Sequence, residues 1–382
     1  MWAAKKLGDV CDIKGGGTPS KSNESFYEGI IPWATVRDMR NERLSCTEMS
    51  ITEEAIKNSS TNLIPSGTII TATRVGLGKV CVLEQDTAIN QDLKAITPKT
   101  EELDNTFLYW WLKSIAHVIV GAGTGATVQG VKLTFVKALE IPLPTLPEQK
   151  RIVALLDTVF ADLEQTRAKT EQNLKNAREL FESKKLNLFE SLSESSKLSS
   201  LPSVCDNIFA GGDAPKKGLF SKEKTEDFNI PIYANAVKNN GLYGFTDYSR
   251  ANEPSITIAA RGSGTGHIEL RTEPFLPIVR LIVLTPNTEI IGLEYLKHAL
   301  QTLDILRSGS AIPQLTVPMI KEYSIPIPSM VAQEKIVSEL ESLKRYIEKI
   351  EAIYQKKLIS IDELKRSILQ KAFSGELTTT AE

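Results

Sequence analysis

The sequence has few cysteines and histidines and no long apolar run. Its 382 residues include four cysteines, far apart and without a C-x-x-C pair, which argues against a zinc site or a disulfide framework. The three histidines are scattered, so we expect no metal site. The longest apolar runs are too short to span a membrane, and the N-terminal residues lack the apolar segment of a signal peptide. We therefore expect a reduced, cytoplasmic protein with no membrane association.

Neither sign of charge predominates. The formal net charge is −2, residues 1–146 carry 15 basic and 16 acidic side chains, and residues 197–330 carry 13 of each. Any nucleic-acid-binding face must therefore come from the arrangement of charges, because there is no overall excess. The chain also lacks a G-x-x-x-x-G-K-[ST] loop, since GGGTPSK does not have the required order, which argues against an ATP site.

An internal repeat organises the chain. Two segments, IPLPTLPEQKRIV and IPIPSMVAQEKIV, share six residues at matching positions. Three further pairs follow the same order at drifting offsets: LGDVCD with LPSVCD, each leading into a glycine loop, IIPWA with NIPIYA, and TRVGLGKV with ARGSGTGHI. One such pair could arise by chance, but four in order indicate two copies of one unit. Within each copy, short β-branched segments broken by Gly, Pro and Asn favour a mixed sheet.

A long helix follows the sheet-forming part of each copy. Residues 148–192 contain no Gly or Pro, which predicts one helix of roughly 45 residues, about 67 Å long. The serine-rich segment 191–203 is expected to be a linker. In the second copy a coiled-coil seam with alternating spacings of four and three ends at Phe373-Ser374-Gly375, a glycine stop. Its positions are Ile336, Leu340, Leu343, Ile347, Ile350, Tyr354, Lys357, Ile361, Leu364, Ile368 and Lys371.

The stripe of the first helix is polar in its middle. Ile152, Leu156, Val159 and Leu163 are followed by Thr166, Thr170 and Asn173, then by Ala177 and Leu180. Such a polar patch either fixes the register of helix pairing or consists of surface threonines, and the sequence does not decide between the two. Each helix has an unburied stripe and joins a globular part at one end. We therefore expect the two helices to pair with each other, antiparallel, as a spacer of fixed length.

With the repeat and both helices in hand, the sequence resembles the specificity subunits of type I restriction–modification systems. The resemblance covers essentially the whole chain and rests on EIPLPTLPEQKRIVALLD, its second copy SIPIPSMVAQEKIVSELE, and the ending LKRSILQKAFSGEL. It implies an α+β fold with a pseudo-two-fold repeat. Two target recognition domains, each a small mixed sheet with helices, are joined by two long helices that form an antiparallel coiled coil. The implied boundaries are 1–146 and 197–330 for the domains, and 147–196 and 331–377 for the helices.

The resemblance also implies a function. Each domain recognises one half of a split sequence in double-stranded DNA, and the helices set the gap between the halves. The subunit is non-catalytic and has no cofactor of its own. It docks two methyltransferase subunits and, in the full complex, nuclease/translocase subunits, and S-adenosylmethionine, ATP and Mg are expected in those partners. The absence of N-P-P-[YF] and D-P-P-[YF], by which amino-methyltransferases of this kind hold their target base, agrees with this expectation.

Basic and polar residues in loops are the candidates for DNA contact. Arg and Asn discriminate guanine and adenine by bidentate hydrogen bonds, whereas Lys mostly contacts phosphate. The strongest candidates are Arg74 and Arg261, because both copies place an arginine before a G-x-G turn, although a repeated arginine can also be structural. The full set is Lys14, Lys21, Arg37, Arg40, Arg43, Arg74, Lys79, Gln129, Lys132, Lys216, Lys217, Asn235, Lys238, Asn239, Tyr243, Arg261 and His267.

One stretch offers an alternative function. HVIVGAGTGATVQG matches G-x-G-x-x-A with an acidic residue, Glu140, downstream, as in a nucleotide- or S-adenosylmethionine-dependent enzyme with a loop at Gly121 and Gly123. Such a loop needs a strand before it and a helix after it. Helical spacing from Phe107 to Ile119 instead predicts a helix before the glycines. The E-x-K pairs at Glu148 and Glu182, which resemble half of a nuclease motif, lie on the predicted helix and are attributed to chance.

Overall fold

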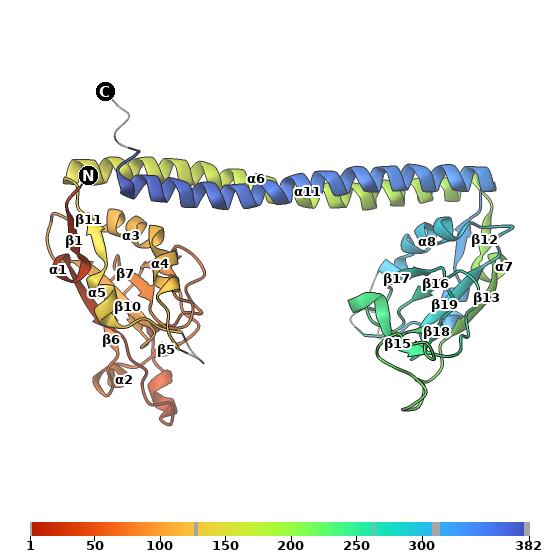
Figure 1. Ribbon diagram of the computed structural model, residues 1–382, viewed down its shortest axis with the longest axis horizontal. Helices are drawn as coiled ribbons and strands as arrows, with labels where there is room; N and C mark the ends of the chain where they lie inside the picture. The colour runs from red at the N-terminus through yellow and green to blue at the C-terminus, as the bar shows by residue number, and fades with distance from the viewer. Residues whose placement is uncertain (1, 126–128, 263, 308–313, 378–382) are drawn as a thin grey trace. The chain divides into compact units, whose positions relative to one another are not determined.

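The computed structural model describes residues 2–125, 129–262, 264–307 and 314–377. The chain forms two compact units, which are treated separately below. Unit 1 comprises Met1–Thr170 with Lys356–Glu382, and unit 2 comprises Glu171–Gln355. Each unit contains one globular domain and one part of each long helix, α6 (Leu146–Ser195) and α11 (Met330–Ser374) (Figure 1). None of the helices in the described ranges has the length and hydrophobicity needed to span a membrane.

The domain of unit 1 contains two sheets. Strands β2-β10-β7-β8-β4 form one sheet, β5-β3-β9-β6 form the second, and β1 pairs with β11 in a short ribbon. Most pairs are antiparallel, but β3 is parallel to β9 and β4 is parallel to β8. The elements are β1 (Ala4–Lys6), α1 (Leu7–Val10), β2 (Cys11–Gly15), η1 (Glu24–Tyr27), β3 (Ile31–Ala34), β4 (Arg43–Leu44), β5 (Ser50–Ile51), α2 (Glu53–Lys57), β6 (Asn62–Ile64), β7 (Ile69–Ala72), β8 (Val80–Leu83), β9 (Thr87–Ile89), β10 (Leu93–Pro98), α3 (Asn105–Ser114), α4 (Ala116–Gly121), α5 (Leu133–Ala138) and β11 (Glu140–Pro142).

The domain of unit 2 repeats this plan. Its main sheet has the order β13-β19-β16-β17, its second sheet is β15-β14-β18 with β14 parallel to β18, and β12 pairs with β20. The internal repeat predicted from the sequence is therefore confirmed. The elements are β12 (Leu198–Ser200), α7 (Leu201–Val204), β13 (Cys205–Ala210), β14 (Ile230–Tyr233), η2 (Lys238–Gly241), β15 (Leu242–Thr246), β16 (Ser255–Ile258), β17 (Ile268–Arg271), β18 (Leu276–Pro277), β19 (Ile282–Pro286), α8 (Leu293–Gln301), α9 (Asp304–Arg307), α10 (Val317–Lys321) and β20 (Ser324–Pro326).

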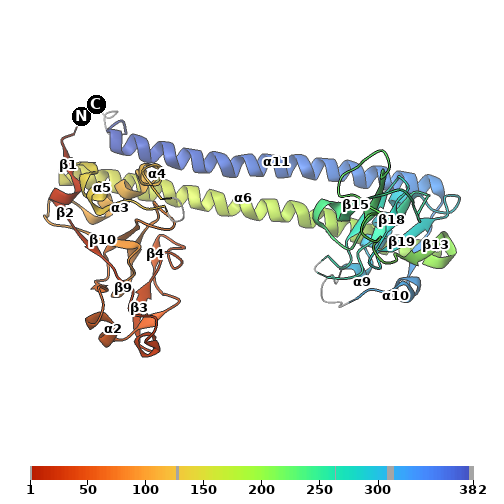
Figure 2. The same ribbon diagram turned by 60° about the horizontal axis from the view of Figure 1, so that its bottom comes forward.

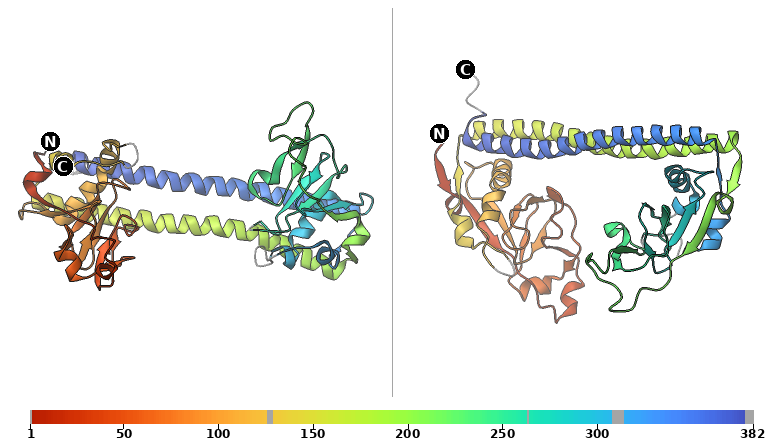
Figure 3. Two further views of the ribbon diagram at one scale, coloured as in Figure 1. Left: turned by 90° about the horizontal axis from the view of Figure 1, so that it is seen from below. Right: turned by 45° about the vertical axis from the view of Figure 1, so that its right-hand side comes forward.

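The two long helices pair antiparallel, as expected. In unit 1 Glu164 pairs with Lys365 and Arg167 with Asp362. The residue numbers of the partners thus increase along α6 as they decrease along α11, which is the antiparallel arrangement. In unit 2 Arg178 donates to Glu351 at 2.9 Å. Within each unit, α6 and α11 lie side by side in every view (Figures 1, 2 and 3). These ion pairs are mostly exposed, so the buried stripes between the helices contribute most of the pairing energy.

The predicted seam of α11 is confirmed up to Tyr354 and again at Ile361 and Ile368, but it is wrong at three positions of the second half. The positions up to Tyr354 are buried or half-buried, but Lys357, Leu364 and Lys371 are exposed. The buried stripe continues instead through Leu358, Ile361, Lys365, Ile368 and Ala372. Two consecutive steps of four, at Tyr354 and Leu358, shift the stripe, because an α-helix has 3.6 and not 3.5 residues per turn.

The seam of α6 also differs in detail from the prediction. Asn173 and Leu180 are exposed, and Leu174 and Phe181 take their places. Thr170 is only 1% exposed, so it belongs to the seam and is not a surface threonine. Its hydroxyl donates to the carbonyl of Thr166 at 2.7 Å, within the same helix. The polar patch is therefore satisfied locally.

The serine-rich segment 191–203 is not a linker. Helix α6 extends through Ser195, β12 then pairs with β20, and α7 follows directly. The hydroxyls of Ser193 and Ser195 donate to backbone carbonyls of the preceding turn, at 2.8 Å and 2.9 Å. Serine is therefore compatible with the helix end here, and its abundance was a misleading signal of a flexible connection.

A buried glutamine joins each domain to its helix. Gln149 accepts a hydrogen bond from the amide of Asp104 at 2.8 Å and donates to the carbonyls of Glu102 and Pro144 at 2.7 and 2.9 Å. This glutamine is the last residue of the I-P-x-P-x-x-x-x-Q motif. Its three hydrogen bonds fix the start of α6 against the loop that precedes α3.

The second copy repeats this contact atom for atom. Gln333 accepts from the amide of Gly292 at 2.9 Å and donates to the carbonyls of Ile290 and Pro328 at 2.9 and 3.0 Å. Both glutamines are almost fully buried, at 0% and 1% exposed. The motif therefore holds the helix-preceding loop of each domain to its long helix. We call these two contacts the glutamine clamps.

Candidate functional site

The stretch around Gly121 does not form a nucleotide-binding loop. Helix α3 and then α4 precede the glycines, and α4 ends at Gly121, as the helical spacing predicted. The next helix, α5, begins only at Leu133. The glycines thus follow the C-terminal end of a helix, whose partial negative charge disfavours phosphate. Ala126, the last position of the fingerprint, and most of the matching segment of the second copy lie outside the described residues.

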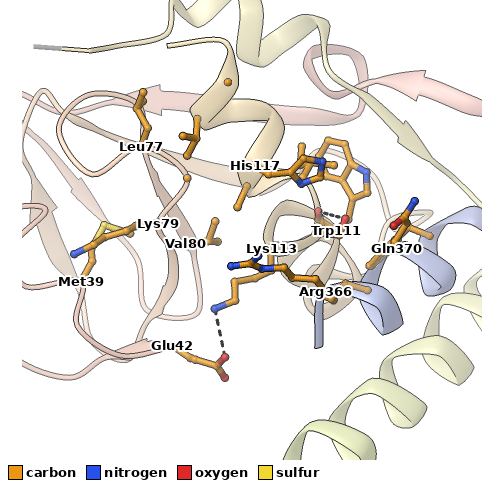
Figure 4. A pocket seen from close by; sticks show the side chains of 18 of the residues that line it. Met39, Glu42, Leu77, Lys79, Val80, Trp111, Lys113, His117, Arg366 and Gln370 are labelled. Carbon is orange, nitrogen blue, oxygen red and sulfur yellow. Dashed lines mark hydrogen bonds and ion pairs between the residues drawn. The ribbon is translucent and has the colours of Figure 1, made fainter. Parts of the chain in front are cut away.

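A cleft within unit 1 includes Gly121 in its wall. The hairpin between β7 and β8, helices α3 and α4, and the end of α11 line it, and Lys113 points toward Glu42 with their charged atoms 3.4 Å apart (Figure 4). Its charged side chains are mixed, namely Arg40, Lys79, Lys113 and Arg366 with Glu42, Glu140 and Glu164. This near balance of charge does not favour an anionic cofactor.

Several of the candidate DNA-contact residues of unit 1 lie at or near the tip of the β7–β8 hairpin. Arg74 follows β7, is exposed, and lies 3.7 Å from the carboxylate of Asp92. Its backbone forms a bridge to Gly130 in the segment that returns toward α5, and the amide of Val131 donates to the carbonyl of Thr73 at 2.9 Å. The hairpin tip and the return segment therefore lie together. Val75, next to Arg74, has a positive φ of 45°, which marks a constrained turn.

Other predicted residues of unit 1 lie around this tip. The ammonium of Lys79 donates to the carbonyl of Val36 at 3.4 Å, which places the loop of Arg37 and Arg40 beside the hairpin. Arg40 also donates to the carbonyl of Arg37 at 3.2 Å. Gln129 and Lys132 are exposed in the return segment. Arg43, in contrast, lies in β4 at the edge of the main sheet, paired with Val82.

The glycine loop after β2 packs against the protein itself. A side chain at Gly16 would clash with the carbonyl oxygen of Ile89, and the amide of Gly17 donates to that oxygen at 3.0 Å. These glycines are thus required for packing, and close approach to a phosphate is not needed to explain them. Lys14 is exposed in β2, opposite Ala95, and Lys21 is exposed in the loop.

The β16–β17 hairpin of unit 2 has the same construction. Arg261 follows β16 and bridges to Gln314, and its guanidinium donates to the Gln314 side chain at 2.9 Å. In both copies, then, an exposed arginine lies where the hairpin meets the return segment. His267, at the other end of this tip, is half-buried with its Nε2 2.8 Å from Glu269, so part of its hydrogen-bonding capacity is used inside the protein.

The remaining predicted residues of unit 2 have differing environments. Lys216, Lys217 and Lys238 are exposed, and Asn239 is exposed at a positive φ of 52°. Asn235 has a structural role, because its side-chain oxygen accepts from the amide of Ala260 at 2.8 Å and its nitrogen donates to Val279. Asn235 therefore fixes the loop to the hairpin, with one of its two amide hydrogens and one lone pair of its oxygen.

Two basic residues near these loops, Lys222 and Arg280, were not among the candidates selected from the sequence. Lys222 lies 3.6 Å from the centre of the Tyr243 ring, which stacks on Phe220. Arg280 is exposed in a turn where both it and Val279 have positive φ values, 61° and 52°. The charged run SKEK contained the signal for Lys222. No local pattern marked Arg280, which stood within an apolar run.

Two buried or half-buried basic groups near these loops, Lys94 and Arg271, have altered pKa values. Burial lowers the pKa of Lys94, which lies beside Asp92 and Arg74, while the Asp92 carboxylate opposes the shift. Burial also lowers the pKa of Arg271, whose guanidinium stacks 3.6 Å from the centre of the Tyr233 ring and lies near Glu269 and Glu273. Arg271 is only 7% exposed, so it supports the sheet and does not belong to the contact surface.

The comparison with protein families decides what this architecture is. The family model described as the type I restriction modification DNA specificity domain matches residues 1–174 and 194–358, one match for each copy. The chain belongs to the family of type I specificity subunits. The alternative of a nucleotide- or S-adenosylmethionine-dependent enzyme finds no support.

Relatives and solved structures agree with this assignment. The MjaIX type I restriction enzyme specificity subunit of Methanocaldococcus jannaschii is 25% identical, over 98% of this chain and 93% of its own. A chain solved in work on complex assembly and conformational transition of the type I R-M system has the same fold, with a TM-score of 0.76 and 18% identity over 98% of both chains. The HsdS subunit of Thermoanaerobacter tengcongensis has a TM-score of 0.61 and 18% identity over 98% of this chain and 97% of its own.

Proposed function

We propose that each domain of this specificity subunit recognises one half of a split sequence in double-stranded DNA, while α6 and α11 set the gap between the halves. The observation that supports this most is the repeated hairpin tip, which carries an exposed arginine, Arg74 or Arg261, beside the return segment in each copy. Arginine is the side chain best suited to bidentate recognition of guanine. Two domains with the same framework and different loops are suited to a split DNA site whose halves differ in sequence.

The near-neutral charge of both domains limits their own affinity for DNA. Non-specific affinity depends on the number of phosphates that basic side chains neutralise, and here acidic side chains match the basic ones in number. The methyltransferase subunits therefore supply part of the electrostatic attraction. The candidate residues in the loops would supply specificity more than affinity.

Partners carry out the catalysis in this proposal. The subunit docks two methyltransferase subunits and, in the full complex, nuclease/translocase subunits, and it works in the cytoplasm. S-adenosylmethionine, ATP and Mg bind in those partners, and the present chain is non-catalytic. The E-x-K pairs agree with this, since Glu148 and Glu182 both lie on α6 and pair with Arg151 and Lys185 of the same helix.

A domain exchange tests the modular part of the proposal. Replacing residues 1–140 by the corresponding domain of another family member should change one half of the methylated sequence and leave the other half and the gap unchanged. The readout is modified-base sequencing of genomic DNA methylated by the reconstituted complex. The matched control replaces the second domain and should change the opposite half. A change in both halves on either exchange contradicts independent readers.

A heptad deletion tests the spacer. Residues 174–180 and 349–355 lie opposite each other on α6 and α11, as the Arg178–Glu351 pair shows. Deleting both segments keeps the antiparallel pairing and shortens the spacer by about 10 Å, because each residue contributes about 1.5 Å. The gap should then shorten by about three base pairs at about 3.4 Å each. An unchanged gap in an active complex contradicts the role of the helices.

A further inference from the structure

Three potential metal ligands meet between a domain helix and a long helix of unit 2. Glu294 and His298 lie on the same face of α8, one turn apart, and Glu341 comes from α11. One ligand atom of each residue lies within 4.8 Å of the other two. Nε2 of His298 and Oε1 of Glu341 are 3.7 Å apart, which is too far for a hydrogen bond.

His298 is deeply buried and unsatisfied. It is 3% exposed, and neither ring nitrogen has a hydrogen-bond partner among the described residues. The buried Oε2 of Glu294 also lacks one there, although the ammonium of Lys297 lies 3.7 Å from it. Buried polar atoms are rarely left without partners, because each costs about 1–3 kcal/mol. His298 and Glu294 therefore have buried polar atoms without hydrogen-bond partners, in a cluster whose ligand atoms lie within 4.8 Å of one another.

The corresponding place in unit 1 is satisfied without any additional group. There, α3 carries Trp110 at the position equivalent to His298, and its Nε1 donates to Asp157 of α6 at 2.9 Å. Asp157 is equivalent to Glu341 by the alignment of the two I-P-x-P motifs. A direct hydrogen bond thus joins domain helix to long helix in unit 1. In unit 2 the equivalent side chains, His298 and Glu341, are 3.7 Å apart and form no hydrogen bond.

The surroundings of the cluster are electrostatically mixed. Lys185, Lys297 and Lys344 lie close enough to affect His298, and Glu341 opposes their influence. Lys185, which affects His298 most among these lysines, is already engaged, because its buried ammonium lies 2.8 Å from Glu182 and donates to Gln301 at 3.1 Å. Burial first, and then these lysines, lower the pKa of His298 from 6.5 to about 4. The imidazole is therefore neutral at pH 7, which is the form that binds metals.

We propose that Glu294, His298 and Glu341 bind a divalent transition metal ion such as Zn²⁺. Three atoms no more than 4.8 Å apart lie within about 2.8 Å of a common point (4.8 Å divided by √3), and zinc bonds to nitrogen and oxygen are about 2.0–2.2 Å. Small side-chain rotations of the two half-buried glutamates close that difference. One imidazole and two carboxylates suit a borderline ion, and water would complete its shell once the Lys297 ammonium moves away from Glu294.

The ion would join α8 to α11. It would take the place of the Trp110–Asp157 hydrogen bond of the first copy, so the attachment of the second domain to its long helix becomes dependent on metal. Since metal binds the folded arrangement and not the separated ligands, it also stabilises unit 2.

Equilibrium dialysis of the full chain against Zn²⁺ tests the site. The intact chain should bind one equivalent more than the His298→Gln and Glu341→Gln variants. Glu339→Gln is the matched control, because Glu339 is exposed on the same helix and outside the cluster, and it should bind as the intact chain does. Cysteine-bound zinc is separated by substituting Co²⁺, whose visible spectrum should show nitrogen and oxygen ligation without a thiolate band.

A stability readout makes the test independent of a folding defect. Zn²⁺ should raise the Tm of unit 2 by about 2–4 °C or more in the intact chain and not in the variants. The double variant His298→Trp with Glu341→Asp copies the contact of unit 1, so it should fold, lose the extra equivalent and become insensitive to Zn²⁺. Equal zinc stoichiometry in the intact chain and in folded His298→Gln, Glu341→Gln or the double variant overturns the proposal.

Discussion

The two junctions between domain and long helix share one contact and differ in the next. Both have a glutamine clamp, in which Gln149 or Gln333 makes the same three hydrogen bonds. The second contact lies further along the long helix, after the glutamine. In unit 1 it is the Trp110–Asp157 hydrogen bond, whereas in unit 2 Nε2 of His298 lies 3.7 Å from Oε1 of Glu341. The clamp is therefore the common requirement for attaching a domain, and the neighbouring contact is where the copies have diverged.

The difference has a physical meaning for how each domain is held. In both units the domain core is continuous with the long helices: Phe107 of α3 packs in one cluster with Leu156 of α6, and Tyr295 of α8 in one cluster with Leu340 of α11. Hydrophobic packing thus anchors both domains. The neighbouring polar contacts differ, because unit 1 has a direct hydrogen bond there, whereas unit 2 has a buried imidazole that is neutral at pH 7 and that we propose binds metal.

Removing a glutamine clamp should have the largest effect. Gln149→Leu leaves an amide and two carbonyls buried without partners, and the expected loss is about 4 kcal/mol of the free energy of unfolding of unit 1. Gln333→Leu should cost unit 2 about the same amount. All four tryptophans lie in unit 1, so their fluorescence follows that unit alone, while circular dichroism follows both. Denaturant titrations with both probes measure the two losses separately.

This experiment tests whether the two glutamine clamps contribute equally to the stability of their units. If Gln149→Leu is costly and Gln333→Leu is neutral, the clamps are not equivalent despite their identical geometry. Glu148→Gln is a suitable control next to Gln149, since it removes only the ion pair with Arg151 on the helix surface. Its expected effect is below about 1 kcal/mol.

Acid should destabilise unit 2 more than unit 1. His298 has a pKa of about 4 when folded and its ordinary value of 6.5 when unfolded, so the unfolded chain binds the proton first as the pH falls. The stabilisation by neutral His298 is fully present above pH 6.5 and is lost between there and pH 4. The expected loss from pH 7 to pH 5 is about 2 kcal/mol in buffer with a chelator.

Urea denaturation at the two pH values measures this loss. His298→Phe should remove the corresponding part of the pH dependence of unit 2, whereas the tryptophan-monitored transition of unit 1 should keep its own pH profile, because Trp110 does not titrate. The same pH dependence in the intact chain and in His298→Phe would contradict the assignment of this loss to His298.

The sequence predicted the large-scale organisation because that depends on patterns. Repeated motifs revealed the two copies, and the absence of Gly and Pro revealed the long helices. Finer features failed where competing forces decide them. The stripe of α11 shifts after Tyr354, and residues 198–200 form a strand because a partner, β20, is available. Local composition contains no information about such a partner.

Repeated patterns in the sequence also identified candidate contact residues, but the sequence did not show which contacts their side chains make in the folded domain. Arg74 and Arg261 could be selected from the sequence because both copies repeat the arginine before a glycine turn. Asn235 stays a candidate for base contact, but the sequence did not indicate that its side chain also holds two backbone groups of its own domain. The His298 cluster was missed because Glu341 is 43 residues from His298 in the sequence and only folding brings α8 and α11 together.

The most direct test of the central claim compares Arg74→Gln with Arg261→Gln in the complex reconstituted with its methyltransferase subunits. Because each arginine is exposed, each substitution should change the stability of its domain little. It should reduce discrimination between base pairs at its own half-site, by about 1–3 kcal/mol for the base pair concerned. Modified-base sequencing should then show relaxed specificity in one half for Arg74→Gln and in the other half for Arg261→Gln. Relaxation of the same half by both variants, or of neither half, would contradict the account.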